Sequence, residues 1–480
     1  MKNKIVITAI ILSCFALNTY SKITLPTILD NNMVLQQKTD VKLWGNASPN
    51  STVEIKPSWA DRTYSSLCNP NGQWECSIPT LEAGGPYEIN LNDGESLILK
   101  NILIGEVWFC SGQSNMEMPM KGFDRQPVEN TNNVIAKAKT STPIRTYTTD
   151  SQDGKWVRQF NKQPQTDCIG EWLDNSPENV ANVSAVAYFF AQYIQEVLDV
   201  PVGIIVSTRG GSNVESWMSE DALLPFKEIN LSHLSNDVEI KNPTSIPCVL
   251  YNAKIAPITN FVIKGFLWYQ GESNRNNAEL YKKLMLAFVK DLRRKWNVGD
   301  FPFYYVQIAP FNYEGPNSTT SAKLQEVQTQ HMREIPNSGM VTTLDIGHPV
   351  FIHPTNKKTV GERLACWALG DTYKRNGFGY KPAVYSSMEI TDEKIYINFN
   401  NASRGLSPMW TQLKEFEIAG EDRIFHPAKA EIEEKSGRLA VSSEKVTTPV
   451  AVRYAYKNYA EATLFGVDGI PVAPFRTDNW

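Results

Sequence analysis

The spacing of apolar residues changes twice along the chain and divides it into three regions. From residue 22 to 103, short apolar runs alternate with turn-forming clusters of Asn, Gly and Pro, which predicts a β-sandwich. From 104 to 375, runs that are apolar almost throughout alternate with segments of helical spacing. This pattern is typical of parallel strands covered by helices on both faces. Alternating strand patterns return over 376–480. We therefore predict a doubly wound α/β domain between two β-rich regions.

The middle region is expected to hold five strands and four helices. The apolar runs expected as strands lie at 104–110, 202–206, 262–269, 303–308 and 340–344. The stripes expected as helices lie at 186–198, 280–296, 324–332 and 360–368. The segment 121–174 has no strong periodicity and is predicted to be a long loop region over one edge of the site.

The first 21 residues have the features of a secretory signal peptide. Lys2 and Lys4 precede a short apolar run that cannot span a bilayer by itself. We expect cleavage after Ser21 and a secreted or periplasmic protein. Lipidation at Cys14 is the alternative, because the residues before it resemble a lipobox. No other segment is apolar enough to cross a membrane.

Composition narrows the classes of function. With 47 Lys and Arg against 51 Asp and Glu, the net charge is −4. The sequence therefore lacks the excess of positive charge that is typical of nucleic-acid-binding proteins. The six cysteines after Cys14 are scattered, and no metal-ligand spacing appears. Cys68 and Cys76 flank a turn and are expected either to form a cross-strand disulfide or to remain two unpaired small residues. The sequence specifies no oligomeric state.

Two of the expected strands are followed by residues suited to nucleophilic catalysis. Ser114 lies on a tight turn after 104–110, where the next helix offers backbone N–H groups to an oxyanion. Its surroundings are not the G-x-S-x-G elbow of α/β-hydrolases. After 202–206, Gly210 and Gly211 allow a backbone N–H to approach a ligand closely. Taken singly, a helix cap and a glycine turn explain these residues better than catalysis does.

The later strands end in amide, carboxylate and imidazole groups. Gln270, Glu272 and Asn274 follow 262–269 and could supply an oxyanion donor and a carboxylate. His353 follows the last expected strand and is the best placed of five histidines; His348 is less well placed. A nucleophile, oxyanion donors and a base at one edge of a sheet meet the requirements of acyl transfer.

Several sequence blocks carry a family resemblance. They are 105–118 (GEVWFCSGQSNMEM), 210–217 (GGSNVESW), 268–274 (WYQGESN), 352–364 (IHPTNKKTVGERL) and 474–480 (PFRTDNW). These blocks resemble those of the sialate O-acetylesterase-like members of the SGNH hydrolase superfamily. The resemblance covers essentially the whole mature chain. It implies an SGNH-type, flavodoxin-like parallel-sheet catalytic domain, and a carbohydrate O-acetylesterase without metal or cofactor.

The resemblance also implies roles for individual residues. Ser114 would be the nucleophile and His353 the general base of a two-step reaction through an acetyl-serine intermediate. The backbone N–H groups of Ser114 and Gly211, with a side-chain amide from Gln270 or Asn274, would form the oxyanion hole.

The orienting acid departs from the superfamily pattern. SGNH hydrolases usually carry an Asp shortly before this histidine, but Val350 and Phe351 stand there. Asp345 and Glu272 are the candidate acids, and a dyad whose histidine is held by a backbone carbonyl is the third option. The missing acid keeps a second function open, a glycan-binding protein with weak catalysis. A lipase or thioesterase on the same scaffold is a third. The sequence does not distinguish sialic acid from an acetylated glycan such as xylan as the substrate.

Overall fold

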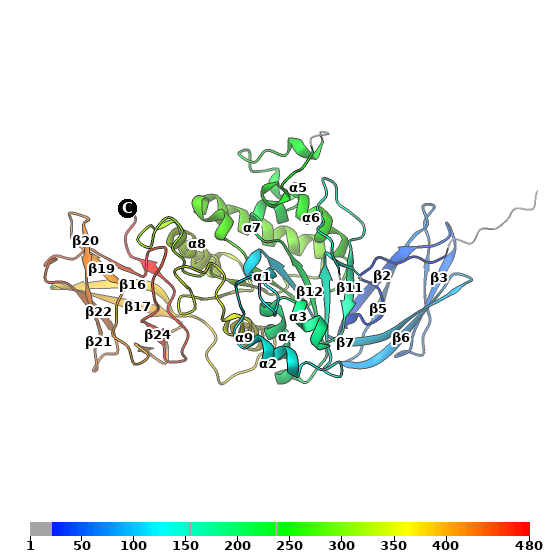
Figure 1. The fold of residues 1–480 in the computed structure, drawn as a ribbon, viewed down its shortest axis with the longest axis horizontal. Helices are drawn as coiled ribbons and strands as arrows, with labels where there is room; N and C mark the ends of the chain where they lie inside the picture. Colours follow the sequence, from blue (N-terminus) through cyan, green and yellow to red (C-terminus); the bar gives the residue numbers. More distant parts are fainter. Residues whose placement is uncertain (1–21, 153–154, 236–238) are drawn as a thin grey trace, which may run out of the picture.

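The computed structural model describes residues 22–152, 155–235 and 239–480. The predicted signal peptide at 1–21, with Cys14, lies outside the described residues. The molecule is elongated, with the N-terminal strands at one end, the C-terminal strands at the other and the α/β region between them (Figure 1).

A mostly parallel sheet forms the centre of the molecule. Its strand order is β11-β8-β12-β7-β13-β14-β15, and only β11 runs antiparallel to its neighbour. The strands are β7 (Ser96–Gly112), β8 (Ile144–Thr149), β11 (Gly170–Leu173), β12 (Val202–Thr208), β13 (Gly265–Tyr269), β14 (Phe303–Val306) and β15 (Ser338–Val341). The predicted SGNH-like α/β fold class is confirmed.

Helices cover both faces of this sheet. The α-helices are α1 (Ser114–Glu117), α2 (Thr131–Lys137), α3 (Pro177–Asn182), α4 (Ala185–Leu198), α5 (Glu220–Leu223), α6 (Val249–Lys254), α7 (Ala278–Trp296), α8 (Thr320–Glu334) and α9 (Lys357–Trp367). Shorter helical turns are η1 (Val214–Trp217), η2 (Ser232–Leu234), η3 (Pro243–Ser245), η4 (Ala256–Ile258), η5 (Glu272–Asn277) and η6 (Ala368–Thr372). In Figure 1, α5, α6, α7 and α8 lie above the sheet and α4 and α9 below it.

Alternate residues of β7 explain why both faces need cover. Val107 and Phe109 belong to the core under α7, and Phe109 stacks on Phe266 with ring centroids 4.9 Å apart. Trp108 and Cys110 belong to the core under α4 and α9. All of these side chains are fully buried. Successive side chains of a strand point to opposite faces of the sheet. An interior parallel strand, covered on both faces, is therefore expected to be apolar at every position.

The strand β7 belongs to two parts of the fold. Its first half pairs with β6 (Gly84–Asn92) and β1 (Val34–Gln36) of the N-terminal region. Its second half pairs with β12 and β13 of the central sheet. The domain boundary predicted between residues 103 and 104 therefore falls within one continuous strand.

The remaining strands form the two flanking regions. The N-terminal region also contains β2 (Asp40–Asn46), β3 (Thr52–Pro57), β4 (Tyr64–Leu67) and β5 (Gln73–Pro79). The C-terminal region contains β16 (Val384–Thr391), β17 (Lys394–Asn400), β18 (Leu406–Ser407), β19 (Phe416–Ala419), β20 (Phe425–Pro427), β21 (Lys429–Ile432), β22 (Leu439–Ser442), β23 (Ala451–Tyr454), β24 (Phe465–Gly466) and β25 (Phe475–Arg476). Its two four-stranded antiparallel sheets enclose a separate core.

The prediction of one long loop over 121–174 is wrong. This segment holds α2, the central strand β8, the edge strand β11 and the small hairpin of β9 (Ser151–Gln152) and β10 (Lys155–Trp156). β8 is buried along its whole length although its sequence, IRTYTT, is half threonine. The β-branched Thr residues suit a strand but are not apolar enough to stand out in a hydropathy pattern.

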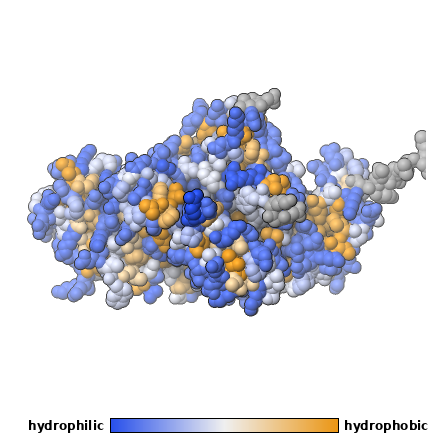
Figure 2. All heavy atoms as spheres, in the orientation of Figure 1, coloured by the Kyte–Doolittle hydropathy of each residue, from blue (hydrophilic) through white to orange (hydrophobic). Residues whose placement is uncertain are grey.

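Two further expectations concern cysteines and membranes. Cys68 and Cys76 are both unpaired, as are the other cysteines of the described residues. Within those residues, no helix has the length and apolar character needed to span a membrane. The face seen in Figure 2 is mostly hydrophilic, with its hydrophobic residues in separate small patches.

Candidate functional site

The turn after β7 places Ser114 at the start of α1. Gly112 has φ +144°, and a Cβ there would lie 2.1 Å from the carbonyl oxygen of Tyr269. Only glycine allows β7 and β13 to approach this closely. The next residue, Gln113, donates its N–H to the same Tyr269 carbonyl at 3.0 Å. Ser114 is left half-buried at the carboxyl edge of the sheet.

The backbone N–H groups near Ser114 that have no hydrogen-bond acceptor among the described residues include those of Ser114 itself and Gly211. Gly211 has φ +71°, and no atom lies within 4 Å of the position of a Cβ. Its neighbour Gly210 is close to Ser114, because a Cβ on Gly210 would lie 3.4 Å from Ser114 Cβ. The N–H of Gly210 donates to the Glu117 carboxylate, so it is Gly211 that keeps a free donor.

The amides of Gln270 and Asn274 brace the loop after β12. Gln270 Nε2 donates to Ser212 O at 3.0 Å and to Asn274 Oδ1 at 2.7 Å. Both of its hydrogens are therefore used. Asn274 Nδ2 donates to Glu215 Oε2 at 2.9 Å, and its Oδ1 also accepts the Val214 N–H. Of the two amides predicted as oxyanion donors, only Asn274 retains an unused hydrogen.

The side chain of Asn115 connects three segments of the site. Its Nδ2 donates to Glu272 Oε1 at 2.7 Å and to the carbonyl of Ile352 at 3.1 Å. Its Oδ1 accepts from Lys357 Nζ at 2.6 Å. Asn115 follows Ser114 in the chain, and Ile352 precedes His353. The Asn115–Ile352 hydrogen bond therefore holds the serine and histidine segments side by side.

The charged partners of Asn115 are both buried. Burial lowers the pKa of Lys357 to about 7, although Glu272 opposes the shift. Burial raises the pKa of Glu272, although hydrogen bonds and Lys357 oppose that shift. The second carboxylate oxygen of Glu272 has no hydrogen-bond partner among the described residues.

His353 is held by the loop that follows α1. Its Nδ1 lies 2.5 Å from Gln126 Oε1. The ring of Phe123 meets the imidazole edge-on, with centroids 5.3 Å apart. Burial and the charge of Lys357 lower the pKa of His353 to about 4. The imidazole is therefore neutral at physiological pH, as a general base must be.

Neither carboxylate predicted to orient His353 is hydrogen-bonded to it. Asp345 forms a two-point ion pair with Arg363 at 2.8 and 2.6 Å, and Glu272 is held by Asn115. His348 Nδ1 is also occupied, because it accepts hydrogen bonds from the backbone N–H groups of Val350 and Phe351, each at 3.2 Å. The group beside His353 Nδ1 is the neutral amide of Gln126, and not either candidate acid.

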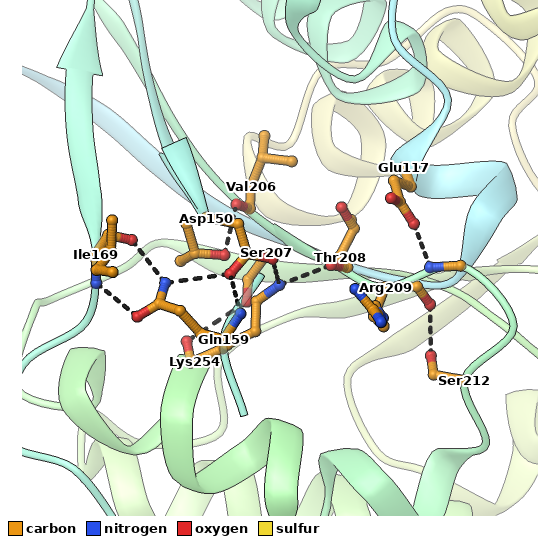
Figure 3. Close-up of polar contacts among 12 residues, drawn as sticks. Glu117, Asp150, Gln159, Ile169, Val206, Ser207, Thr208, Arg209, Ser212 and Lys254 are labelled. Atoms are coloured by element: carbon orange, nitrogen blue, oxygen red, sulfur yellow. Dashed lines mark hydrogen bonds and ion pairs between the residues drawn. The ribbon is translucent and has the colours of Figure 1, made fainter. Parts of the chain in front are cut away.

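A buried ion pair supports the loop that carries Gly211 (Figure 3). Lys254 Nζ, at the end of α6, donates to Asp150 Oδ2 at 2.5 Å and to the Thr208 carbonyl at 2.7 Å. Both charged side chains are about 1% exposed. Gln159 donates its N–H and its side-chain amide to the other oxygen of Asp150, each at 3.1 Å. The pair thus ties the carboxyl end of β12 to the segment after β10.

Comparisons with known proteins agree on one family. Residues 104–369 match the family model of the carbohydrate esterases described as sialic acid-specific acetylesterases. The chain belongs to this family. It is therefore a carboxylic ester hydrolase that removes acetyl groups from carbohydrates.

Individual relatives match nearly the whole chain. The human sialate O-acetylesterase is 26% identical over 93% of this chain and 91% of its own. The mouse sialate O-acetylesterase is 24% identical over 93% of each. A carbohydrate acetylesterase from Xanthomonas citri has a crystal structure that matches with a TM-score of 0.85 and 32% identity, over 96% of this chain and 100% of its own. The alternative of a glycan-binding protein finds no support in these relatives.

Sequence reasoning missed three residues of this family member's site. Asn115 and Lys357 lie inside the blocks that resemble the family, but their contact joins positions 242 residues apart. Gln126 lies in a segment that was expected to be loop, and no pattern marks it. Its proximity to His353 follows only from the path of the chain.

The ion pair below the site generates a stability prediction. Asp150→Leu leaves the Lys254 ammonium buried without a counter-charge, so we expect a loss of about 3–5 kcal/mol in the free energy of unfolding. The double variant Asp150→Leu/Lys254→Met removes both charges and is expected to recover most of that loss. Urea unfolding of the wild type, Asp150→Leu, Lys254→Met and the double variant measures the coupling free energy between the two side chains. Equal instability of Asp150→Leu and the double variant would contradict it.

Proposed function

We propose that this esterase uses Ser114 as a nucleophile and His353 as the general base in removing an O-acetyl group from a sugar. The hydrogen bond between Asn115 and Ile352 carries the proposal, because it joins the neighbours of these two residues at 3.1 Å. The free N–H groups of Ser114 and Gly211 support it, since a tetrahedral intermediate needs donors beside the nucleophile.

The first half of the reaction acylates the serine. Ser114 Oγ attacks the acetyl carbonyl carbon while its proton passes to His353 Nε2. The N–H groups of Ser114 and Gly211 stabilise the negative oxygen, and the spare amide hydrogen of Asn274 is a further candidate donor. Collapse of the intermediate breaks the bond to the sugar oxygen, which leaves with the proton from His353.

The second half restores the enzyme. Water gives a proton to His353 Nε2 as its oxygen attacks the acetyl-Ser114 ester. The tetrahedral intermediate is stabilised by the same donors. When it collapses, acetate leaves and His353 returns the proton to Ser114 Oγ. Each half-reaction begins with a neutral imidazole, which the lowered pKa of His353 provides.

The substrate we propose is an O-acetylated sialic acid or another acetylated glycan such as xylan. The relatives named as sialate O-acetylesterases support the first, and the Xanthomonas citri carbohydrate acetylesterase supports a broader class. We further propose that the protein is exported. The support is the sequence of residues 1–21, with cleavage after Ser21 and lipidation at Cys14 as its two forms.

Removing either catalytic side chain tests the mechanism. Ser114→Ala and His353→Ala are each expected to lower kcat on p-nitrophenyl acetate by about 10⁴-fold or more, because the two residues act as a unit. Matched controls are Ser111→Ala in the same segment and His348→Ala in the histidine loop, and both are expected to keep near-normal activity. Near-normal activity of His353→Ala would show that the base assignment is wrong.

The environment of His353 predicts the acid limit of activity. With a pKa of about 4, His353 stays neutral down to mildly acidic pH and becomes protonated only below it. Because the protonated imidazole cannot accept the serine proton, we expect kcat/KM to fall as pH drops through about 4. Acetate release measured across the pH range checks this. A half-maximal point near 6.5, the ordinary value for histidine, would contradict it.

A panel of natural esters tests the substrate. Acetate release is measured from O-acetylated sialic acids, acetylxylan and acetylated pectin, with Ser114→Ala as the blank. We expect the largest kcat/KM on one of the sugar esters. A substantial preference for p-nitrophenyl octanoate over the acetate ester would instead favour the lipase or thioesterase hypothesis.

A further inference from the structure

We propose that Gln126 is the residue that positions the catalytic histidine, so that the third member of the triad is a neutral amide. The proposal rests on the proposed roles of Ser114 and His353. It adds to them a positioning residue that comes from the loop after α1.

A tight turn fixes the backbone of Gln126. Phe123 and Gln126 exchange N–H···O hydrogen bonds, each 3.0 Å long, and so close a tight hairpin. Gly122, just before it, has φ +82°, and a Cβ there would lie 2.5 Å from the Gln126 carbonyl oxygen. The hairpin presents two side chains to one imidazole, the Phe123 ring at its edge and the Gln126 amide at Nδ1.

The hairpin is also tied directly to the histidine segment. The N–H of Glu129 donates to the Thr355 carbonyl at 3.0 Å. The Thr355 hydroxyl donates to Glu129 Oε1 at 2.7 Å. These two bonds lie within three residues of Gln126 and two residues of His353 along the chain. These bonds hold the backbone after the hairpin beside the backbone of the histidine segment.

The chemistry of the amide oxygen selects the tautomer of His353. A carbonyl oxygen accepts hydrogen bonds and cannot donate them. Nδ1 must therefore carry the proton, which leaves the lone pair of Nε2 free to accept the proton of Ser114. In a catalytic triad, the carboxylate orients the histidine, selects its tautomer and stabilises the imidazolium by its negative charge. A neutral amide can orient the ring and select the tautomer, but it has no charge to stabilise the imidazolium.

The charges that face His353 agree with this division. On its own segment, Lys357 is a buried cation, and the imidazole of His348 caps its own turn. From the hairpin, Asp124 pairs with Arg125, and both side chains are about nine-tenths exposed.

The nearby carboxylates are bound to other groups. Glu129 accepts from the Thr355 hydroxyl. Glu272 accepts from Asn115. Glu117 accepts from the Gly210 N–H. None of these carboxylates is hydrogen-bonded to His353 among the described residues.

Two substitutions of Gln126 separate positioning from mere packing. Gln126→Met keeps the length of the side chain but removes the acceptor. We expect it to lower kcat on p-nitrophenyl acetate by about 10- to 1,000-fold with little change in KM, because the wrong tautomer becomes populated. Gln126→Glu restores an acceptor and adds a charge. It is expected to keep most of the activity and to move the acid limit of kcat/KM upward by about 1–3 pH units, since a neighbouring carboxylate raises the pKa of histidine.

The controls are chosen from the same neighbourhood. Asp124→Asn changes an exposed carboxylate in the same hairpin and is expected to leave kcat unchanged. Asp345→Asn tests the acid that the sequence suggested and is expected to do the same. Thermal unfolding of every variant identifies any loss that comes from misfolding, and Gln126→Glu then gives the pH readout even if Gln126→Met is unstable.

The outcomes distinguish this proposal from the one on which it rests. If the wild-type enzyme hydrolyses none of the esters faster than Ser114→Ala does, the proposed function itself is wrong. An active wild type with a folded Gln126→Met of unchanged kcat would overturn the role of Gln126 alone. An unmoved acid limit in Gln126→Glu would overturn it as well. A large loss of kcat confined to Asp345→Asn would return the orienting role to that carboxylate.

Discussion

The buried amide of Asn115 is the constraint on which the rest of the site depends. It donates to Glu272 and to the Ile352 carbonyl, and it accepts from Lys357. Its three partners come from two segments, the turn after β13 and the loop that enters α9. Because Asn115 is almost completely buried, none of these bonds can be exchanged for water without cost. The serine turn therefore has one position relative to the histidine loop.

The same amide separates two buried charges. Lys357 and Glu272 both bind Asn115 and are not paired directly by a salt bridge among the described residues. The cation lies on the histidine side, where it helps to keep the imidazole neutral. Glu272, a predicted acid for His353, interacts electrostatically with this lysine and hydrogen-bonds to Asn115. Buried acids in such ion networks can have a structural role as well as a catalytic one.

The sequence was sufficient for what depends on local pattern. The apolar runs and helical stripes identified β7, β12, α4 and α7, because burial on both faces demands apolar residues at every position of a central strand. Ser114 and His353 could be predicted as site residues because ligands of open α/β sheets bind beyond the carboxyl ends of strands. The hydropathy pattern did not predict β8, because threonine favours strands but is not apolar. Gln126 was not predicted as a site residue, because its proposed role depends on a contact between positions 227 residues apart. A periodic sequence pattern does not reveal such a contact.

In the proposed mechanism, a neutral partner for His353 affects the attack on the ester and the departure of the sugar in opposite ways. An imidazole of low pKa is a poorer base toward Ser114, but its protonated form is a stronger acid toward the departing sugar oxygen. A sugar alkoxide is a poor leaving group that must be protonated as it departs, so the second property assists the step that needs it. The weaker base must then rely on the N–H groups of Ser114 and Gly211 to lower the barrier to attack. An open glycine loop with an unoccupied donor is the structural feature that such a division requires.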